Sequence, residues 1–249
     1  MTAKTALDSY NNATYNYRNE AVGDWPMEMA QHDPSNVRTL DVSGNGYNAT
    51  FGDGTTSNTI PTKTQERGYD NIATSYLNLG DVAALETQDF GFAVIYDKTV
   101  LGATYAPISV QYNSQAGYAS GWSLQDVTDG SLTFYKSTTS GGSQTATTST
   151  AIFGMEKLFV VGSKIGTSLK IWVNGTLITD NTLASATVNY TTSTTKATSI
   201  GARNSDTGTP GFGLNLVGHY YDGAIFPGGL TPIQAQDLTI DMMKKINNI

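Results

Sequence analysis

The sequence predicts an all-β fold, a two-sheet antiparallel jelly-roll sandwich with one short C-terminal helix. Short segments of apolar or alternating character recur from about residue 76 onward, and clusters of Gly, Asn and Asp separate them. No helical segments of a dozen residues alternate with these segments, so a parallel sheet with crossover helices is disfavoured. The length of 249 residues is compatible with one such domain, since all-β sandwiches reach that size as one unit.

Ten segments have the composition and length expected of antiparallel strands. They are residues 76–79, 90–96, 105–112, 121–127, 131–136, 157–161, 169–173, 176–179, 198–202 and 220–226.

The strongest local signal is a β-hairpin in residues 169–179. Leu169, Ile171 and Val173 fall on one face of its first strand, and Trp172 falls on the other. Asn174-Gly175 supplies the two-residue turn, because both residues tolerate the positive φ angles of a type I′ turn.

A helix is expected near the C-terminus. Thr231 fits its N-cap, Pro232 its first position, and Gln234 completes a capping box. Its apolar stripe consists of Ala235, Leu238, Met242 and Ile246. We expect this helix to pack against the edge of the sandwich.

Two segments lack a sustained period. Residues 1–37 are polar with scattered aromatic side chains and are interpreted as an extended N-terminal arm, so the jelly-roll domain is placed at residues 38–249. The arm either packs on its own domain or reaches a neighbouring copy or a virion lattice. Residues 137–150 are of low complexity and are expected to form a mobile loop.

Charge and composition exclude several classes of function. The net charge is -7, and four arginines provide no basic stripe for phosphates, so we expect no nucleic-acid partner. The chain has no cysteine, which excludes disulfides and thiolate metal sites. No run of about 18 apolar residues occurs, so membrane insertion is not expected.

The order of six short segments resembles the concanavalin A-like lectin/glucanase superfamily, in particular its laminin-G-like branch. These segments are residues 41–48, 76–79, 169–175, 199–202, 221–225 and 230–234. The resemblance covers roughly residues 38–247 and implies two stacked antiparallel sheets, one convex and one concave. It does not determine the function, because this superfold is shared by lectins, glucanases, adhesion modules and structural domains.

The sequence does not predict an enzyme. The resemblance implies that a glucanase member would carry a Glu-x-Asp-x-x-Glu or Glu-x-Asp-x-Glu strand, and neither pattern occurs. No two acidic residues are separated by one residue, so no single strand places two carboxylates side by side on one face. A glycoside hydrolase whose acid pair comes from different strands stays as an alternative.

Residues 41–46 copy the start of a calcium loop, with oxygen side chains at alternate positions. An EF-hand is excluded because Gly52 occupies the twelfth position, where a Glu is required. One interpretation is a turn in which Asp41 and Asn45 bond to nearby backbone amides. The other is a structural calcium site, for which the resemblance implies Asp222 as the partner on a second loop.

Sugar binding requires aromatic faces and a few amides, because a sugar ring has an apolar face and hydroxyls that both donate and accept. Trp122, Tyr135 and Trp172 lie on expected strands and are the candidate ligand-binding residues of a concave or exposed surface. Trp172 is expected to be exposed, because its face is opposite the apolar row of its strand. For Trp122 and Tyr135, the alternative is that they fill the core of the sandwich.

These observations favour a non-catalytic, lectin-like surface protein located on a virion or outside the cell. A chain that starts at Met1 without an export signal, lacks cysteine and carries few charges is typical of a capsid or tail decoration protein. Its expected partners are other virion proteins, copies of itself in a homo-oligomer, and surface glycans. The alternative is a cellular carbohydrate-binding lectin.

Overall fold

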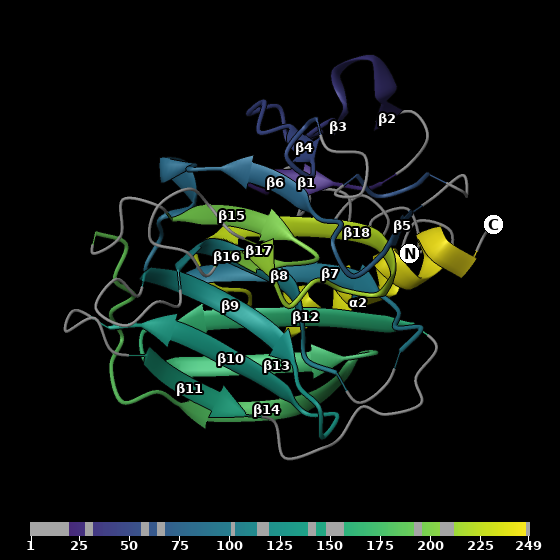
Figure 1. The fold of residues 1–249 in the computed structure, drawn as a ribbon. Coiled ribbons are helices and arrows are strands. Elements are labelled where there is room, and N and C mark those ends of the chain that lie inside the picture. The colour runs from purple at the N-terminus through teal and green to yellow at the C-terminus, as the bar shows by residue number, and fades with distance from the viewer. Residues whose placement is uncertain are drawn as a thin grey trace.

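The computed structural model describes most of the chain. The described residues are 20–27, 32–55, 60–63, 68–100, 103–113, 120–138, 143–147, 157–191, 196–204 and 212–247. Two large antiparallel sheets lie face to face, which confirms the predicted sandwich, and one helix lies outside them (Figure 1).

The seven-stranded sheet contains the first and the last strand of the described chain, β1 and β18, which pair with each other. Its strands, in order across the sheet, are β1 (Gly23–Trp25), β18 (Gly218–Pro227), β7 (Phe90–Tyr96), β12 (Leu158–Ile165), β13 (Ser168–Val173) and β14 (Thr176–Thr182), with β5 (Tyr69–Asn71) paired to β18.

The nine-stranded sheet faces it. Its strands are β11 (Ser143–Thr147), β10 (Leu132–Ser137), β9 (Ser120–Asp126), β8 (Tyr105–Asn113), β15 (Ala197–Ile200), β6 (Leu77–Gly80), β4 (Ala49–Phe51), β3 (Arg38–Thr39) and β2 (His32–Asp33). The described residues also contain the 3₁₀ turns η2 (Pro34–Asn36) and η4 (Ala83–Leu85) and a small sheet of β16 (Arg203–Asn204) and β17 (Phe212–Gly213).

The core lies between the two sheets, and alternation along each strand supplies its side chains. On β9, Trp122 and Leu124 point inward and are fully buried. Trp122 stacks on Phe90 of β7, with ring centroids 4.5 Å apart and planes 4° apart, so this pair joins the two sheets.

All ten expected strands are present, with bounds that differ by a few residues. The predicted hairpin is formed by β13 and β14, in which Val173 pairs with Thr176. Asn174 and Gly175 have φ angles of 49° and 81°, as a type I′ turn requires.

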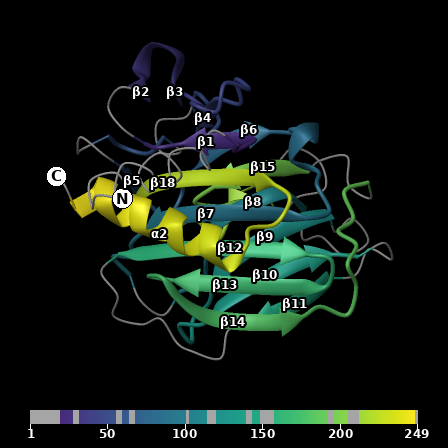
Figure 2. The same ribbon diagram turned by 180° about the vertical axis from the view of Figure 1, so that it is seen from behind.

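The C-terminal helix α2 (Pro232–Asn247) begins with the predicted capping box. The backbone amide of Thr231 donates to the Gln234 side chain at 2.8 Å, and the amide of Gln234 donates to the Thr231 hydroxyl at 3.3 Å. The expected position at the sandwich edge is wrong, because α2 lies across the outer face of the seven-stranded sheet (Figure 2).

This helix explains why Trp172 is buried. Trp172 does point away from the inner row of β13, as alternation predicts, yet only 2% of it is exposed. It packs in a second apolar cluster with Val161, Leu238 and Met242, the last two from α2. The predicted exposure of Trp172 is therefore wrong, since the sequence pattern of one strand does not show that a distant helix covers its outer face.

Part of the expected N-terminal arm belongs to the sandwich. Within residues 20–37, β1 pairs with β18, and β2 pairs with β3 at residues 38–39. Trp25 is fully buried in the core, and its ring nitrogen donates to the Tyr47 carbonyl at 2.8 Å. Residues 1–19, with the other aromatic side chains of the expected arm, lie outside the described residues.

The expected loop at residues 137–150 contains a strand. β11 pairs with β10 from Thr133↔Thr147 to Ser137↔Ser143 and forms the edge of the nine-stranded sheet. Threonine-rich segments favour strands where a paired edge is available, and low complexity hides that preference.

We expect Trp172→Ala to lower the free energy of unfolding by about 3–5 kcal/mol, because truncation leaves a cavity beneath α2. Lys170→Ala on the same strand is the control, since Lys170 makes only an exposed ion pair with Asp180 worth about 0–1 kcal/mol. Urea unfolding of both variants measures the difference. Equal stabilities would show that the contact with α2 contributes little.

Candidate functional site

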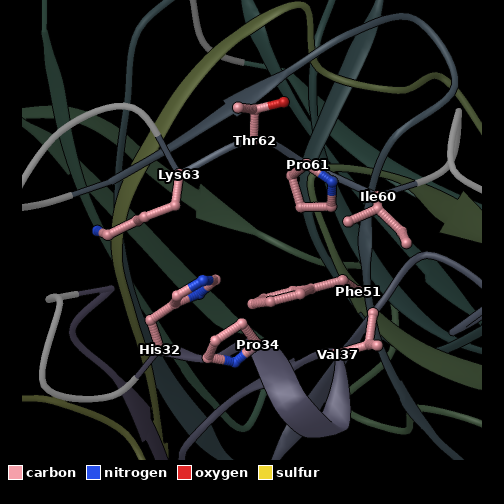
Figure 3. Close-up of a pocket in the computed structure, with 8 residues that line it drawn as sticks. All are labelled: His32, Pro34, Val37, Phe51, Ile60, Pro61, Thr62 and Lys63. Carbon is pink, nitrogen blue, oxygen red and sulfur yellow. The ribbon is translucent and has the colours of Figure 1, made fainter.

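A cavity of about 460 Å³ lies where β2, η2 and β4 meet the segment 60–63. We call it the pocket. Eight residues line it, and Figure 3 shows them around the opening: His32, Pro34, Val37, Phe51, Ile60, Pro61, Thr62 and Lys63.

One wall of the pocket is the β2–η2–β3 hairpin. Asp33 pairs with Arg38 in the ladder, and their side chains form an ion pair at 2.9 Å. Pro34 begins the 3₁₀ turn, where its fixed φ suits a turn start. Val37 closes the turn with a φ of 51°, and its carbonyl accepts from the Phe51 amide at 2.8 Å. The hairpin is thus held against β4.

The rings of His32 and Phe51 form the floor, and the buried ring of Tyr69 packs against them. His32 stacks on Phe51 with centroids 5.4 Å apart, and Phe51 lies 5.0 Å from the Tyr69 ring. The His32 Nδ1 atom lies 3.0 Å from the Tyr69 hydroxyl, which fixes the orientation of the imidazole. Burial raises the pKa of Tyr69 to about 12, so its hydroxyl keeps its proton at neutral pH.

His32 is a neutral imidazole at neutral pH. Burial lowers its pKa from the ordinary value of 6.5, and the Lys63 ammonium lowers it further, whereas Asp33 acts in the opposite direction. With Nδ1 bonded to Tyr69, the other ring nitrogen remains to donate or accept according to the tautomer.

The opposite wall is held by backbone bonds to β5. Thr62 and Asp70 exchange both amide bonds, at 3.0 and 2.8 Å. The Lys63 ammonium donates to the carbonyls of Met27 and Gly68 and lies 4.8 Å from the centroid of the Tyr69 ring. Lys63 therefore ties this wall to the floor and places a positive charge beside the pocket.

A histidine clamp connects β5 to the centre of the seven-stranded sheet. His219 on β18 lies between two carboxylates, with Nε2 2.9 Å from Asp70 and Nδ1 2.7 Å from Asp97. The Tyr221 hydroxyl donates to the other oxygen of Asp97 at 2.7 Å. Because Asp70 also pairs with Thr62, the pocket wall is fixed indirectly to β18.

The chemistry of the pocket suits binding. Its polar groups are one imidazole, one hydroxyl and one ammonium, and no carboxylate is among the eight lining residues. The described lining residues therefore contain no pair of carboxyl groups of the kind that a glycosidase uses. Across the described ranges, no three His, Asp or Glu side chains are grouped so as to hold a metal ion.

The candidate ligand residues lie away from this pocket. Trp122 is fully buried between the sheets, which is the alternative that the sequence left open for it. Trp172 is buried beneath α2. Tyr135 is half-buried on β10, directly opposite Ser123 of β9, and its role in ligand binding stays a prediction.

The structure places Asp41 in a turn rich in hydrogen bonds. One carboxylate oxygen accepts from the amides of Asp24 and Ser43, both at 2.9 Å. The other accepts from the Ser43 hydroxyl at 2.7 Å and the Tyr47 amide at 3.0 Å. The side-chain amide of Asn45 donates to the Val22 carbonyl at 2.9 Å.

The oxygen atoms of Asp41, as they are bonded in this structure, do not fit a calcium site. Both oxygens of Asp41 already accept two bonds each, so a cation would have to displace these donors. The third proposed ligand, Asp222, is fully buried on β18. Burial raises the pKa of the Tyr220 hydroxyl, and the negative charge of Asp222 raises it further. Calcium binding stays a prediction.

Sequence reasoning missed the pocket. His32, Phe51 and Thr62 come from three separate segments, and only tertiary structure brings them together. The one available signal was the pair of histidines, since the chain has only His32 and His219 and both contact β5.

The fold is that of known carbohydrate-binding β-sandwiches. The carbohydrate-binding module CBM40 of the Ruminococcus gnavus IT-sialidase, solved with alpha2,3 sialyllactose, has a TM-score of 0.55 at 15% identity, covering 69% of this chain and 97% of that one. Domain 4 of AbnA, a GH43 extracellular arabinanase from Geobacillus stearothermophilus solved with arabinotriose, has a TM-score of 0.60 at 15% identity, covering 88% and 98%.

A structure of botulinum neurotoxin type C, whose cell entry depends upon interaction with two ganglioside molecules, has a TM-score of 0.60 at 15% identity. It covers 92% of this chain, which spans about half of the neurotoxin chain (52%). At such identities the likeness shows the fold alone. No protein-family model and no curated protein sequence matches the chain.

We expect Asp41→Ala to destabilise the protein by about 1–3 kcal/mol, because four donors in the turn lose their acceptor. A chelator should leave the melting temperature of the unaltered protein unchanged if Asp41 serves only this turn. Differential scanning fluorimetry with and without EDTA measures both effects. A chelator-induced drop that Asp41→Ala and Asp222→Ala each abolish would establish the calcium site.

His32 should make stability depend on pH. The pKa of His32 is lowered in the folded state, so the unfolded chain binds more protons as the pH falls. The contribution of the neutral His32 to the free energy of unfolding is therefore complete above pH 6.5 and is lost as the pH falls through the folded pKa. We expect His32→Gln to flatten the fall in unfolding free energy between about pH 7 and 5. Urea titrations across this range measure it, and identical slopes would contradict the assignment.

Proposed function

We propose that this chain is a non-catalytic, lectin-like surface protein that binds glycans through the pocket. The observation that carries the proposal is the pocket itself: a cavity that joins an aromatic floor to a few polar groups, His32, Thr62 and Lys63. Ligand sites in proteins usually have this composition, in which apolar walls supply affinity and a few polar groups orient the ligand.

The size and the polar groups suit a sugar. A cavity of about 460 Å³ lies within the range of small-molecule sites and accommodates one or two sugar rings. The free nitrogen of His32 and the hydroxyl of Thr62 can each donate or accept, as sugar hydroxyls do. A neutral imidazole is suited to hydrogen bonds with uncharged sugar hydroxyls, because it does not require a charged partner.

Known proteins of the same fold support the proposal. The structural relatives include modules solved with sialyllactose and with arabinotriose. The eight lining residues that the structure describes carry no carboxylate, and a binding role needs none.

The setting that we propose is a surface outside the cell, with attachment to a virion capsid or tail. The support comes from composition: the chain has no cysteine, and only 14% of its residues are charged. No helix in the described part of the chain is long and apolar enough to cross a membrane. Homo-oligomer formation and contacts with other virion proteins, both through the N-terminal segment, are part of this proposal.

A glycan array identifies the ligands, and calorimetry with the best of them tests the site. We expect His32→Ala to weaken binding about tenfold, because one hydrogen bond and one ring contact are lost. Ile233→Ala is the control, since Ile233 is 69% exposed on α2, far from the pocket in sequence. Tyr135→Ala tests the face of the nine-stranded sheet. If only Tyr135→Ala lost binding, the glycan site would lie on the face of the nine-stranded sheet and not in the pocket. An array without any bound glycan would contradict the proposed function.

A further inference from the structure

The lining of the pocket has two sides of different chemistry. Five of the eight lining residues are apolar: Pro34, Val37, Phe51, Ile60 and Pro61. Figure 3 shows Val37, Phe51, Ile60 and Pro61 on one side of the opening and His32 and Lys63 on the other. The cavity therefore fits a ligand that is itself polar at one end and apolar at the other.

An unsubstituted hexose fits this division poorly. Its apolar surface is one face of the ring, and hydroxyls project all around the rim. In this pocket, some of those hydroxyls would meet Val37, Ile60 and Pro61, which offer no side-chain hydrogen bond. Burial of a hydroxyl without a partner costs free energy, so a plain hexose would bind weakly.

An acetamido group removes this conflict. Its methyl group can lie against the apolar side, while the ring hydroxyls remain near His32 and Thr62. Its carbonyl oxygen is an acceptor that a donor from His32 or Thr62, both in the lining, can satisfy.

We infer that the pocket selects sugars that carry an acetamido group, the N-acetylhexosamines. This inference rests on the proposed glycan-binding function and names the ligand class of the same site. The apolar side of the pocket determines the selection, whereas His32 contributes to the affinity for any sugar.

Calorimetry with paired methyl glycosides tests the inference. The pairs are N-acetylglucosamine with glucose, N-acetylgalactosamine with galactose, and N-acetylmannosamine with mannose. In at least one pair we expect the acetylated sugar to bind about tenfold or more tightly than its parent, the range typical of one added methyl-sized group in an apolar pocket. Methyl fucoside is a further ligand, because it offers a methyl group without an amide.

Two variants of the apolar side locate the effect. Val37→Thr keeps the shape of the side chain and replaces one methyl with a hydroxyl. Ile60→Thr also introduces a hydroxyl, with a shorter side chain, on the segment 60–63, in case the first variant does not fold. Each should reduce the preference several-fold, because the acetyl methyl loses apolar contact and the new hydroxyl offers a hydrogen-bond partner to a hydroxyl of the parent hexose. Saturation-transfer NMR should show the acetyl methyl as the ligand group closest to the protein.

The outcomes separate the two proposals. Equal binding of parent and acetylated sugars, weakened by His32→Ala, would overturn the inference and leave the glycan-binding function standing. Equal binding of fucoside and acetylated sugars would overturn the role of the amide. No binding of any sugar on the array or in calorimetry would overturn the proposed function itself.

Discussion

The central strands of the seven-stranded sheet are apolar on both faces, and each face requires a cover. All seven residues of β7 are buried, with Phe92 and Val94 facing the nine-stranded sheet and Ala93 and Ile95 facing α2. Removal of either cover would expose a continuous apolar surface to water. The nine-stranded sheet covers one of these apolar faces and α2 covers the other, so both elements keep the same sheet out of water.

The start of α2 is fitted closely to this sheet. The Ser163 hydroxyl donates to the Leu230 carbonyl and accepts from the Leu230 amide, both at 2.8 Å. Gly91 makes the approach possible, since a Cβ atom there would lie 2.5 Å from the Leu230 Cγ atom. Side chains larger than hydrogen at position 91 would push the chain away from the sheet just before the helix begins.

The sequence predicted the features that depend on neighbouring residues. The alternation of Leu169 to Val173, the turn at Asn174-Gly175 and the capping box at Thr231 are all local, and the structure contains each of them. The burial of Trp172 was not predictable in this way, because it depends on a helix about 60 residues further along the chain. The pocket was hidden for the same reason, since no single segment contains enough of its lining to reveal it.

β18 lies inside the seven-stranded sheet, between β1 and β7, although it is the last strand of the chain. β1 and β5 are synthesised long before β18, so neither can pair with it until residues 218–227 emerge. The sheet must then accept a central strand late, a step dominated by contacts between residues far apart in sequence, which are slow to form. The exposed apolar edges of β7 and β1 are open to mispairing during that interval, so the order of synthesis sets the period in which this domain most needs protection from aggregation.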